Sequence, residues 1–244
     1  MSLNACAAIV ERSDPDRFRA AMAAPVATRR ILFPIYAFNI EVTRAPWVTK
    51  EPMIAEMRLQ WWRDALEEIG AGSTVRKHEV VDALSGILDP DGAKALDSLV
   101  VARRWDVYQD AFEDRSHLDE YIDATSGALM WTAARLLGSC DQDDVRKFAY
   151  GVGIANLLRA VPDLENRGRK PLVDGTSAGV KALAQDGLTN LMWGNAPKSV
   201  KLSGFQASTI LKQAIADPTR VANGTLGVGP LKQAIALAKI ALLG

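Results

Sequence analysis

The side chains that most often carry covalent or metal chemistry are few in this sequence and lie far apart. Histidine occurs only as His78 and His117, and cysteine only as Cys6 and Cys140. Neither cysteine has a second cysteine or a histidine at the spacing of a zinc site, so we expect two inert thiols. No nucleophile motif and no glycine-rich phosphate loop is present. These residue types therefore predict neither a metal centre nor covalent catalysis.

A better candidate for binding chemistry is Arg159, which follows an apolar run on a predicted helix. A guanidinium pairs two oxygens at once, so Arg159 could hold a diphosphate or a lipid phosphate without a metal. The alternative, which we prefer, is an ion pair with a neighbouring carboxylate, such as Asp163 one helical turn later. Asn156, three residues earlier on the same face, fits either interpretation.

Two adjacent aromatic residues, Trp61 and Trp62, could line a channel for a polyene chain or a carbocation. Trp61 shares an apolar stripe with Ile54 and Met57, so we expect it in the core, and the pattern leaves Trp62 open. A second stripe follows Trp62 on the same helix, which predicts that this helix is covered by protein on most sides and lies near the middle of a bundle.

Basic residues form short clusters at 29–30 and 167–170, and solvated charge is the usual explanation for such clusters. Arg103 and Arg104 have acids close by and are expected to pair on the surface. The whole chain has 29 basic and 29 acidic residues, a balance that argues against a nucleic-acid-binding protein. Few cysteines, no secretory signal and no apolar run of about 18 residues predict a cytoplasmic protein, at most peripheral to the inner membrane.

The elements that would position these residues are nearly all helices, because strand patterns are absent. Asp14 before Pro15 is typical of a helix start, Ser116 is expected to cap a later helix, and Pro162 is expected to end another. We expect one all-α domain over residues 1–244, with helices at about 15–22, 26–43, 51–69, 79–88, 91–112, 116–137, 141–161, 177–185, 205–216 and 230–243.

Five landmarks follow one another along these helices: Tyr-Ala-Phe-Asn-Ile-Glu at 36–41, Glu-Met-Arg-Leu-Gln-Trp-Trp-Arg-Asp-Ala-Leu at 56–66, Arg-Arg-Trp-Asp-Val-Tyr at 103–108, Tyr-Ile-Asp-Ala-Thr-Ser-Gly-Ala-Leu at 121–129 and Asn-Leu-Leu-Arg at 156–159. The ordered set resembles the squalene/phytoene synthase family over about residues 14–200. That resemblance implies an isoprenoid-synthase-like helical bundle around a central cavity. The helices that hold Trp61, Ala133 and Leu157 would pack around it. Active members join two prenyl diphosphates and hold Mg²⁺ with two acidic helix stretches.

Both acidic stretches are missing here. The first would fall at residues 43–47, which contain no acid, and the second would begin at Ala160 and repeat at Leu164. The double loss resembles the branch of the family that includes the mitochondrial complex I assembly factor and its bacterial relatives. It implies a non-catalytic scaffold or assembly protein without a cofactor or a metal.

This interpretation leaves open a prenyl-diphosphate or lipid ligand and a protein partner in assembly. The residues expected at the cavity are Tyr36, Glu41, Arg44, Trp62, Asn156, Arg159, Asp163 and Arg167. The alternative is an active prenyltransferase in which Glu41, Asp64, Asp163 and Glu165 rebuild a Mg²⁺ site. Two carboxylates that approach each other across the cavity would favour this alternative.

Overall fold

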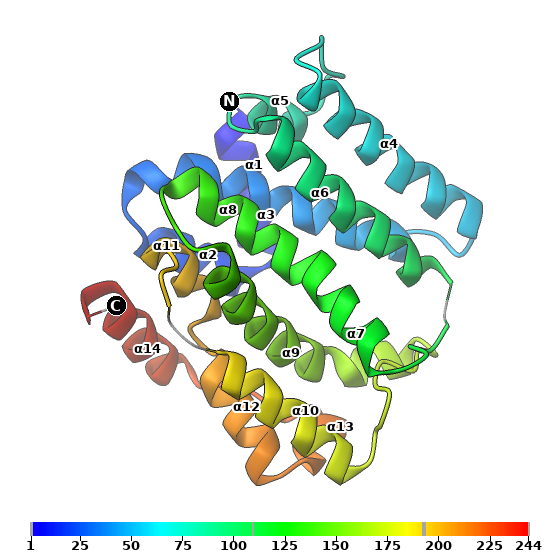
Figure 1. Cartoon of the computed structure of the whole chain (residues 1–244), viewed down its shortest axis with the longest axis vertical. Coiled ribbons are helices and arrows are strands. Elements are labelled where there is room, and N and C mark those ends of the chain that lie inside the picture. The colour runs from blue at the N-terminus through cyan, green and yellow to red at the C-terminus, as the bar shows by residue number, and fades with distance from the viewer. Residues whose placement is uncertain (1, 109, 192–193, 244) are drawn as a thin grey trace.

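The chain folds into a bundle of helices, which Figure 1 colours from blue at the N-terminus to red at the C-terminus. The computed structural model describes residues 2–108, 110–191 and 194–243, and no strand occurs within these ranges. The predicted all-α class is confirmed. Every helix in the described ranges is too short or too polar to cross a membrane.

Fourteen α-helices are described in the chain. They are α1 (Ser2–Ser13), α2 (Pro15–Ala23), α3 (Arg29–Arg44), α4 (Pro52–Gly70), α5 (Glu79–Ser85), α6 (Pro90–Arg103), α7 (Arg115–Ile122), α8 (Ala128–Leu137), α9 (Gln142–Asn166), α10 (Ser177–Asn190), α11 (Lys198–Lys201), α12 (Ala207–Ala216), α13 (Thr219–Ala222) and α14 (Pro230–Leu243). A π-helical turn, Asp123–Gly127, joins α7 to α8, and short 3₁₀ turns follow α3, α6 and α11.

Aspartate caps begin several of these helices. Asp14 accepts a hydrogen bond from the backbone N–H of Arg17 at 2.9 Å and so starts α2 as predicted. The cap of α7 is Asp114, which accepts from the N–H of His117, so the prediction of Ser116 was wrong. Ser116 lies inside the first turn because the aspartate two residues earlier already satisfies a free N–H group.

The long helix α9 continues past Pro162, where the sequence pattern predicted its end. Gly168 ends it instead, with a φ of 78° that favours glycine. The N–H of Gly168 donates to the carbonyl of Glu165, and the N–H of Arg169 donates to that of Leu164, both at 2.9 Å. This pair of bonds is a Schellman motif, and it satisfies carbonyls that a helix end leaves open. The extra turn brings Leu164 to the wall of the central cavity.

The predicted helix over 91–112 ends early, at Arg103. A 3₁₀ turn, Arg104–Val107, follows it and leaves Asp106 buried beneath the surface. There Asp106 accepts from the guanidinium of Arg103 at 3.1 Å. We attribute the early end to this contact and to those that Asp106 makes with other segments, because tertiary interactions override local helix propensity.

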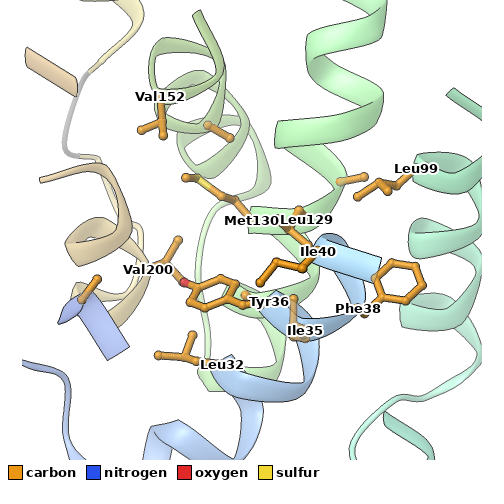
Figure 2. Close-up of a cluster of buried hydrophobic side chains, with 14 of the residues drawn as sticks. Leu32, Ile35, Tyr36, Phe38, Ile40, Leu99, Leu129, Met130, Val152 and Val200 are labelled. Carbon is orange, nitrogen blue, oxygen red and sulfur yellow. The ribbon is translucent and has the colours of Figure 1, made fainter. Parts of the chain in front are cut away.

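The middle of the bundle is α3 rather than α4. In Figure 2, buried side chains from α3 pack among others from α6, α8, α9 and α11. The side chains that α3 contributes are Leu32, Ile35, Tyr36, Phe38 and Ile40. By contrast, α4 lies at the edge of the molecule and packs mainly on α6 (Figure 1). Ile54 and Met57 on α4 are exposed, Trp61 is half-buried and Trp62 is buried. Trp61, expected in the core, is thus only partly buried against it, and Trp62, which the pattern left open, is a core residue.

The first helix, α1, had no counterpart in the sequence-based prediction. It packs against α3 and α5 and buries Cys6, Ile9 and Val10. Burial raises the pKa of the Cys6 thiol to about 12, because a thiolate would lose its hydration there. A buried thiol with a raised pKa is rarely ionised at neutral pH, which agrees with the expectation that Cys6 is inert.

Candidate functional site

A central cavity of about 820 Å³ opens among α2, the end of α3, the π-helical turn, α9 and the start of α12. Apolar side chains such as Ile122, Leu129 and Leu157 cover part of its wall. Asn156 and Arg159 on α9 also line it and remain exposed, so this side of the cavity meets solvent. The space is large enough for a small molecule with an apolar body.

The two stretches where the family resemblance would place acids both face this cavity. Thr43, Arg44 and Trp47 reach it from the end of α3 and the turn that follows. Ala160 and Leu164 reach it from α9. The Oγ1 atom of Thr43 is buried and has no hydrogen-bond partner in the described structure. The sites of the expected carboxylates are thus occupied by a hydroxyl, a guanidinium and apolar groups.

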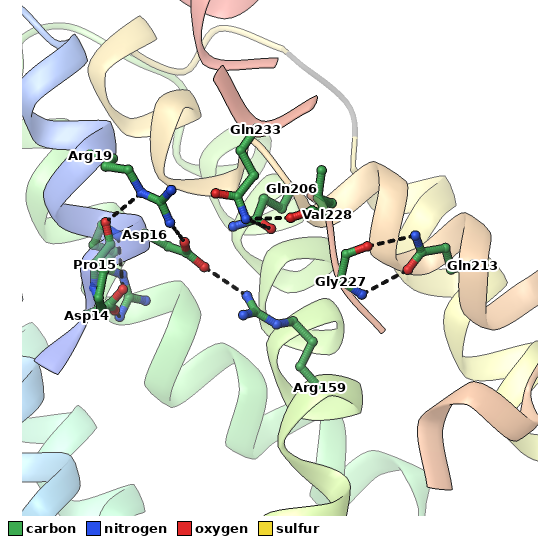
Figure 3. A network of polar contacts seen from close by, with 11 residues as sticks. Asp14, Pro15, Asp16, Arg19, Arg159, Gln206, Gln213, Gly227, Val228 and Gln233 are labelled. Carbon is green, nitrogen blue, oxygen red and sulfur yellow. Dashed lines mark hydrogen bonds and ion pairs between the residues drawn. The ribbon is translucent and has the colours of Figure 1, made fainter. Parts of the chain in front are cut away.

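Three carboxylates do line the cavity, and each is paired with arginine. Asp14 caps α2 and pairs with Arg17 at 3.0 Å. Asp16 pairs with Arg19 at 2.6 Å and with Arg159 at 3.1 Å, as Figure 3 shows. The preferred interpretation of Arg159 as an ion-paired residue is therefore correct, but its partner is Asp16 on α2 and not Asp163, the example that the sequence suggested. Asp163 is exposed, and the cavity wall does not include it.

The third carboxylate, Asp106, lies in a buried polar network. It accepts from the hydroxyl of Tyr121 at 2.9 Å and from Arg103 at 3.1 Å. Arg169 donates to the backbone carbonyl of Asp106 at 2.9 Å and lies 3.5 Å from its carboxylate. Asp106 and Arg169 expose only 8% and 7% of their surfaces, so the charges of this network are largely removed from water. Burial raises the pKa of the Tyr121 phenol, which stays protonated as a donor.

The expected surface pairing of Arg103 and Arg104 is correct only for Arg104. Arg104 lies on the outside and pairs with Glu56 at 2.6 Å. Arg103 is turned inward, where it lines the cavity and contacts Asp106 and Tyr121. Sequence spacing alone could not separate the two, because both have acids within a few residues.

The remaining candidates divide between the cavity, a second groove and the core. Arg44 reaches the central cavity and also a groove of about 450 Å³, which Glu41, Trp61 and Trp62 line as well. Glu41 accepts from Arg44 at 3.2 Å. Tyr36 is buried beside the guanidinium of Arg17, 5.4 Å from its ring centre, and it does not line the cavity. Burial raises the pKa of Tyr36.

The expected packing around one cavity is correct for two of the three helices. Leu157 on α9 lines the central cavity, and so does Leu129 on α8, the helix that holds Ala133. Trp61 faces the separate groove. The helix that holds Trp61 is α4, which lies at the edge of the bundle (Figure 1). An edge helix cannot contribute to a central space.

The basic cluster at 167–170 reaches the cavity rim through Trp47. The guanidinium of Arg167 lies 4.9 Å from the centre of the Trp47 ring, and that of Arg169 lies 5.8 Å from it. Trp47 lines the cavity, so Arg167 lies behind its wall and does not face the space itself. The other cluster, Arg29 and Arg30, is not part of this wall.

The described wall of the cavity contains five arginines and three aspartates. They are Arg17, Arg19, Arg44, Arg103 and Arg159 with Asp14, Asp16 and Asp106. Within the described ranges, no group of three or more histidine, cysteine, aspartate or glutamate side chains could hold a metal ion. An excess of guanidinium groups suits an anion with several oxygens, such as a phosphate or diphosphate.

Comparison with known proteins agrees with this geometry. A family model described as squalene/phytoene synthase matches residues 10–173. The whole fold is similar to a crystal structure of a dehydrosqualene synthase in complex with ligand, with a TM-score of 0.78 and 15% identity over 98% of this chain and 95% of that one. At that identity the likeness concerns the fold.

Curated relatives have a different description. The "NADH dehydrogenase (ubiquinone) complex I, assembly factor 6 homolog" of Drosophila melanogaster is 28% identical over 177 residues, 69% of this chain and 53% of that protein. Assembly factor 6 of Homo sapiens is 22% identical over 161 residues, 64% of this chain and 48% of that protein. The chain thus spans about half the length of the curated relatives it matches. The relationship predicted from the ordered sequence landmarks is confirmed.

Proposed function

Because the chain belongs to the squalene/phytoene synthase family, we propose that it uses the family's fold in the assembly of NADH dehydrogenase complex I and not for prenyl transfer. The curated relatives support the first half of this proposal, since they are named as assembly factors of that complex. The cavity wall supports the second half. We expect neither a metal nor another cofactor in this role.

The proposal rests mainly on one observation: carboxylates are missing from the two stretches that face the cavity, where the family resemblance would place them. Mg²⁺ takes oxygen ligands and shares them with substrate phosphates, so a synthase site needs free carboxylates there. Thr43, Ala160 and Leu164 offer none. Of the carboxylates that line the cavity, Asp16 is already neutralised by two arginines.

The same wall supports a ligand that is held without metal. Arg44 and Arg159 lie next to the former acidic positions, and the unpaired hydroxyl of Thr43 adds a polar group. The apolar part of the wall suits a hydrocarbon chain. We propose an isoprenoid or lipid with a phosphate or diphosphate head as the ligand.

An active prenyltransferase with a rearranged acidic site finds less support. Its four carboxylates, Glu41, Asp64, Asp163 and Glu165, are all outside the central cavity. Asp64 is on α4, where it lies 3.5 Å from Arg76. Glu41 faces the separate groove, and Asp163 and Glu165 are exposed. Carboxylates so placed do not form a pair across the cavity.

The first test concerns turnover. Incubation of the purified protein with farnesyl or geranylgeranyl diphosphate and Mg²⁺ is expected to release no pyrophosphate above background, because no carboxylate pair can hold the metal against the leaving group. A dehydrosqualene synthase assayed in parallel is the positive control. Pyrophosphate release that stops on addition of a chelator would show that the protein is a working synthase.

The second test concerns assembly. Deletion of the gene in its own organism is expected to lower the amount of assembled complex I, measured by native gel electrophoresis and by NADH oxidation in isolated membranes. Reintroduction of the wild-type gene should restore the complex. Normal amounts of complex I in the deletion strain would exclude the assembly role.

A further inference from the structure

The C-terminal helix α14 has an apolar stripe on the face turned away from the protein. Leu231, Ile235 and Leu242 expose 75%, 59% and 79% of their surfaces. Their spacing of four and seven residues places them on one side of the helix. The opposite side contributes Leu237 and Ile240 to the core. The helix therefore has two apolar faces, and only one of them is covered by protein.

Positive charge borders the uncovered face. Lys232 and Lys239 are both exposed, neither has an ion-pair partner in the described structure, and α14 contains no acidic residue. The imbalance extends beyond the helix, because residues 194–244 contain six basic residues and one acid, Asp217, whereas the whole chain is neutral. An apolar stripe beside unpaired lysines is the pattern of a helix that lies on a negatively charged membrane surface.

The covered face of α14 closes part of the central cavity. Gln233 lines the cavity and donates to the carbonyl of Val228 at 2.7 Å and to Oε1 of Gln206 at 3.3 Å, as Figure 3 shows. The helix packs against α2 and α11, next to which it lies in Figure 1. A surface bound by the outer face of α14 would thus lie one helix away from the cavity.

We propose that α14 binds flat on an anionic lipid bilayer, with its apolar stripe at the boundary between headgroups and acyl chains and its lysines among the lipid phosphates. A helix of 14 residues is only about 21 Å long, which is shorter than the hydrocarbon core of a bilayer, so it lies along the surface. The inference is independent of the assembly role. It places a bilayer, a source of apolar ligands, on the outer side of the helix whose inner side contributes Gln233 to the cavity wall.

The apolar half of the proposal is tested by sedimentation with vesicles of phosphatidylcholine and phosphatidylglycerol in equal parts. The triple variant Leu231→Gln/Ile235→Gln/Leu242→Gln is expected to lower the vesicle partition coefficient at least about tenfold, because each side chain loses its transfer into the acyl region. The control is Met53→Gln/Met57→Gln, which changes two exposed apolar residues on α4 and should leave binding within about twofold. Equal binding by the triple variant and the wild type would overturn the proposal.

The charge half is tested with the same vesicles and with pure phosphatidylcholine. The wild type is expected to bind the neutral vesicles at least about tenfold more weakly, and Lys232→Glu/Lys239→Glu should lose binding to the anionic ones to a similar extent. Raising the salt from about 0.1 to 0.5 M should also release the protein. Lys94→Glu/Lys181→Glu, on α6 and α10, is the matched control and should bind as the wild type does. Equal binding to neutral and anionic vesicles would overturn the proposal.

Light scattering tests whether a second copy of the chain, and not a bilayer, covers the apolar stripe of α14. The wild type and the triple variant are both expected to have the mass of a monomer. A wild-type dimer that the triple variant converts to a monomer would show that the stripe is a protein interface, and it would overturn the membrane proposal. All the substituted side chains are exposed, and circular dichroism checks that each variant melts like the wild type. If the triple variant failed to fold, vesicle binding by the lysine variant and its control would still test whether α14 binds the bilayer.

Discussion

Replacement of Asp106 by asparagine is expected to lower the free energy of unfolding by about 3–5 kcal/mol, the usual cost of breaking a buried ion pair by removing one partner. The substitution keeps the shape of the side chain but removes its charge. Arg103 and Arg169 would then face each other with no carboxylate between them, and both are largely withdrawn from water. Tyr121 would also lose the charged acceptor of its hydroxyl hydrogen bond.

Denaturant unfolding measures this loss, and an exposed pair provides the control. Glu41→Gln breaks the ion pair with Arg44, whose side chain is 53% exposed, and should cost less than about 1 kcal/mol. A cost for Asp106→Asn that is no larger than that of Glu41→Gln would mean that water reaches the network and screens it.

Local sequence signals predicted most of the helices. They failed where contacts between residues far apart in sequence determine the end of a helix. Asp14 was recognised as a cap because the cap and its N–H donor lie three residues apart. The end of α9 was placed at Pro162 because a proline usually stops a helix, but Gly168 closes it with a Schellman motif. A proline inside a helix removes one hydrogen bond, and we attribute the continuation of α9 to the burial of Val161 in the core, which offsets that loss.

The position of α4 could not be predicted from its periodicity. The helix has two apolar stripes, and the pattern does not say which of them faces protein. Trp62 faces inward against Phe38, with ring centres 5.4 Å apart, whereas Ile54 and Met57 remain exposed. Exposed apolar side chains are common on protein surfaces, so an apolar stripe is weak support for burial.

The cavity wall was predictable where the family resemblance supplied positions and not elsewhere. Thr43, Ala160 and Leu164 were expected at the site and line it. Asp16 was missed because it lies in the first turn of α2, where an acid is explained by the helix dipole. Its pairing with Arg159 spans 143 residues of sequence, a separation at which no local spacing applies.

The binding of a prenyl diphosphate without metal is the second effect that we expect to be large. Farnesyl diphosphate should bind the wild type in the presence of a chelator, because guanidinium groups take the place of Mg²⁺ at the diphosphate. Arg44 lies within the first stretch where the family has acids, Arg159 directly precedes the second, and both line the cavity. A hydrogen bond between charged groups is worth about 1.5–3 kcal/mol, so loss of each arginine should weaken binding roughly 10- to 150-fold.

Calorimetric titration of Arg44→Ala, Arg159→Ala and the double variant measures this effect, and the double variant should lose at least about 100-fold. Arg58→Ala is the matched control, because Arg58 lines only the separate groove and should leave the affinity unchanged. Arg44 and Arg159 are 53% and 38% exposed and make surface ion pairs, so their loss should cost less than about 1 kcal/mol of stability. Binding that requires Mg²⁺, or that falls equally in Arg58→Ala, would show that the central cavity does not hold the diphosphate in this way.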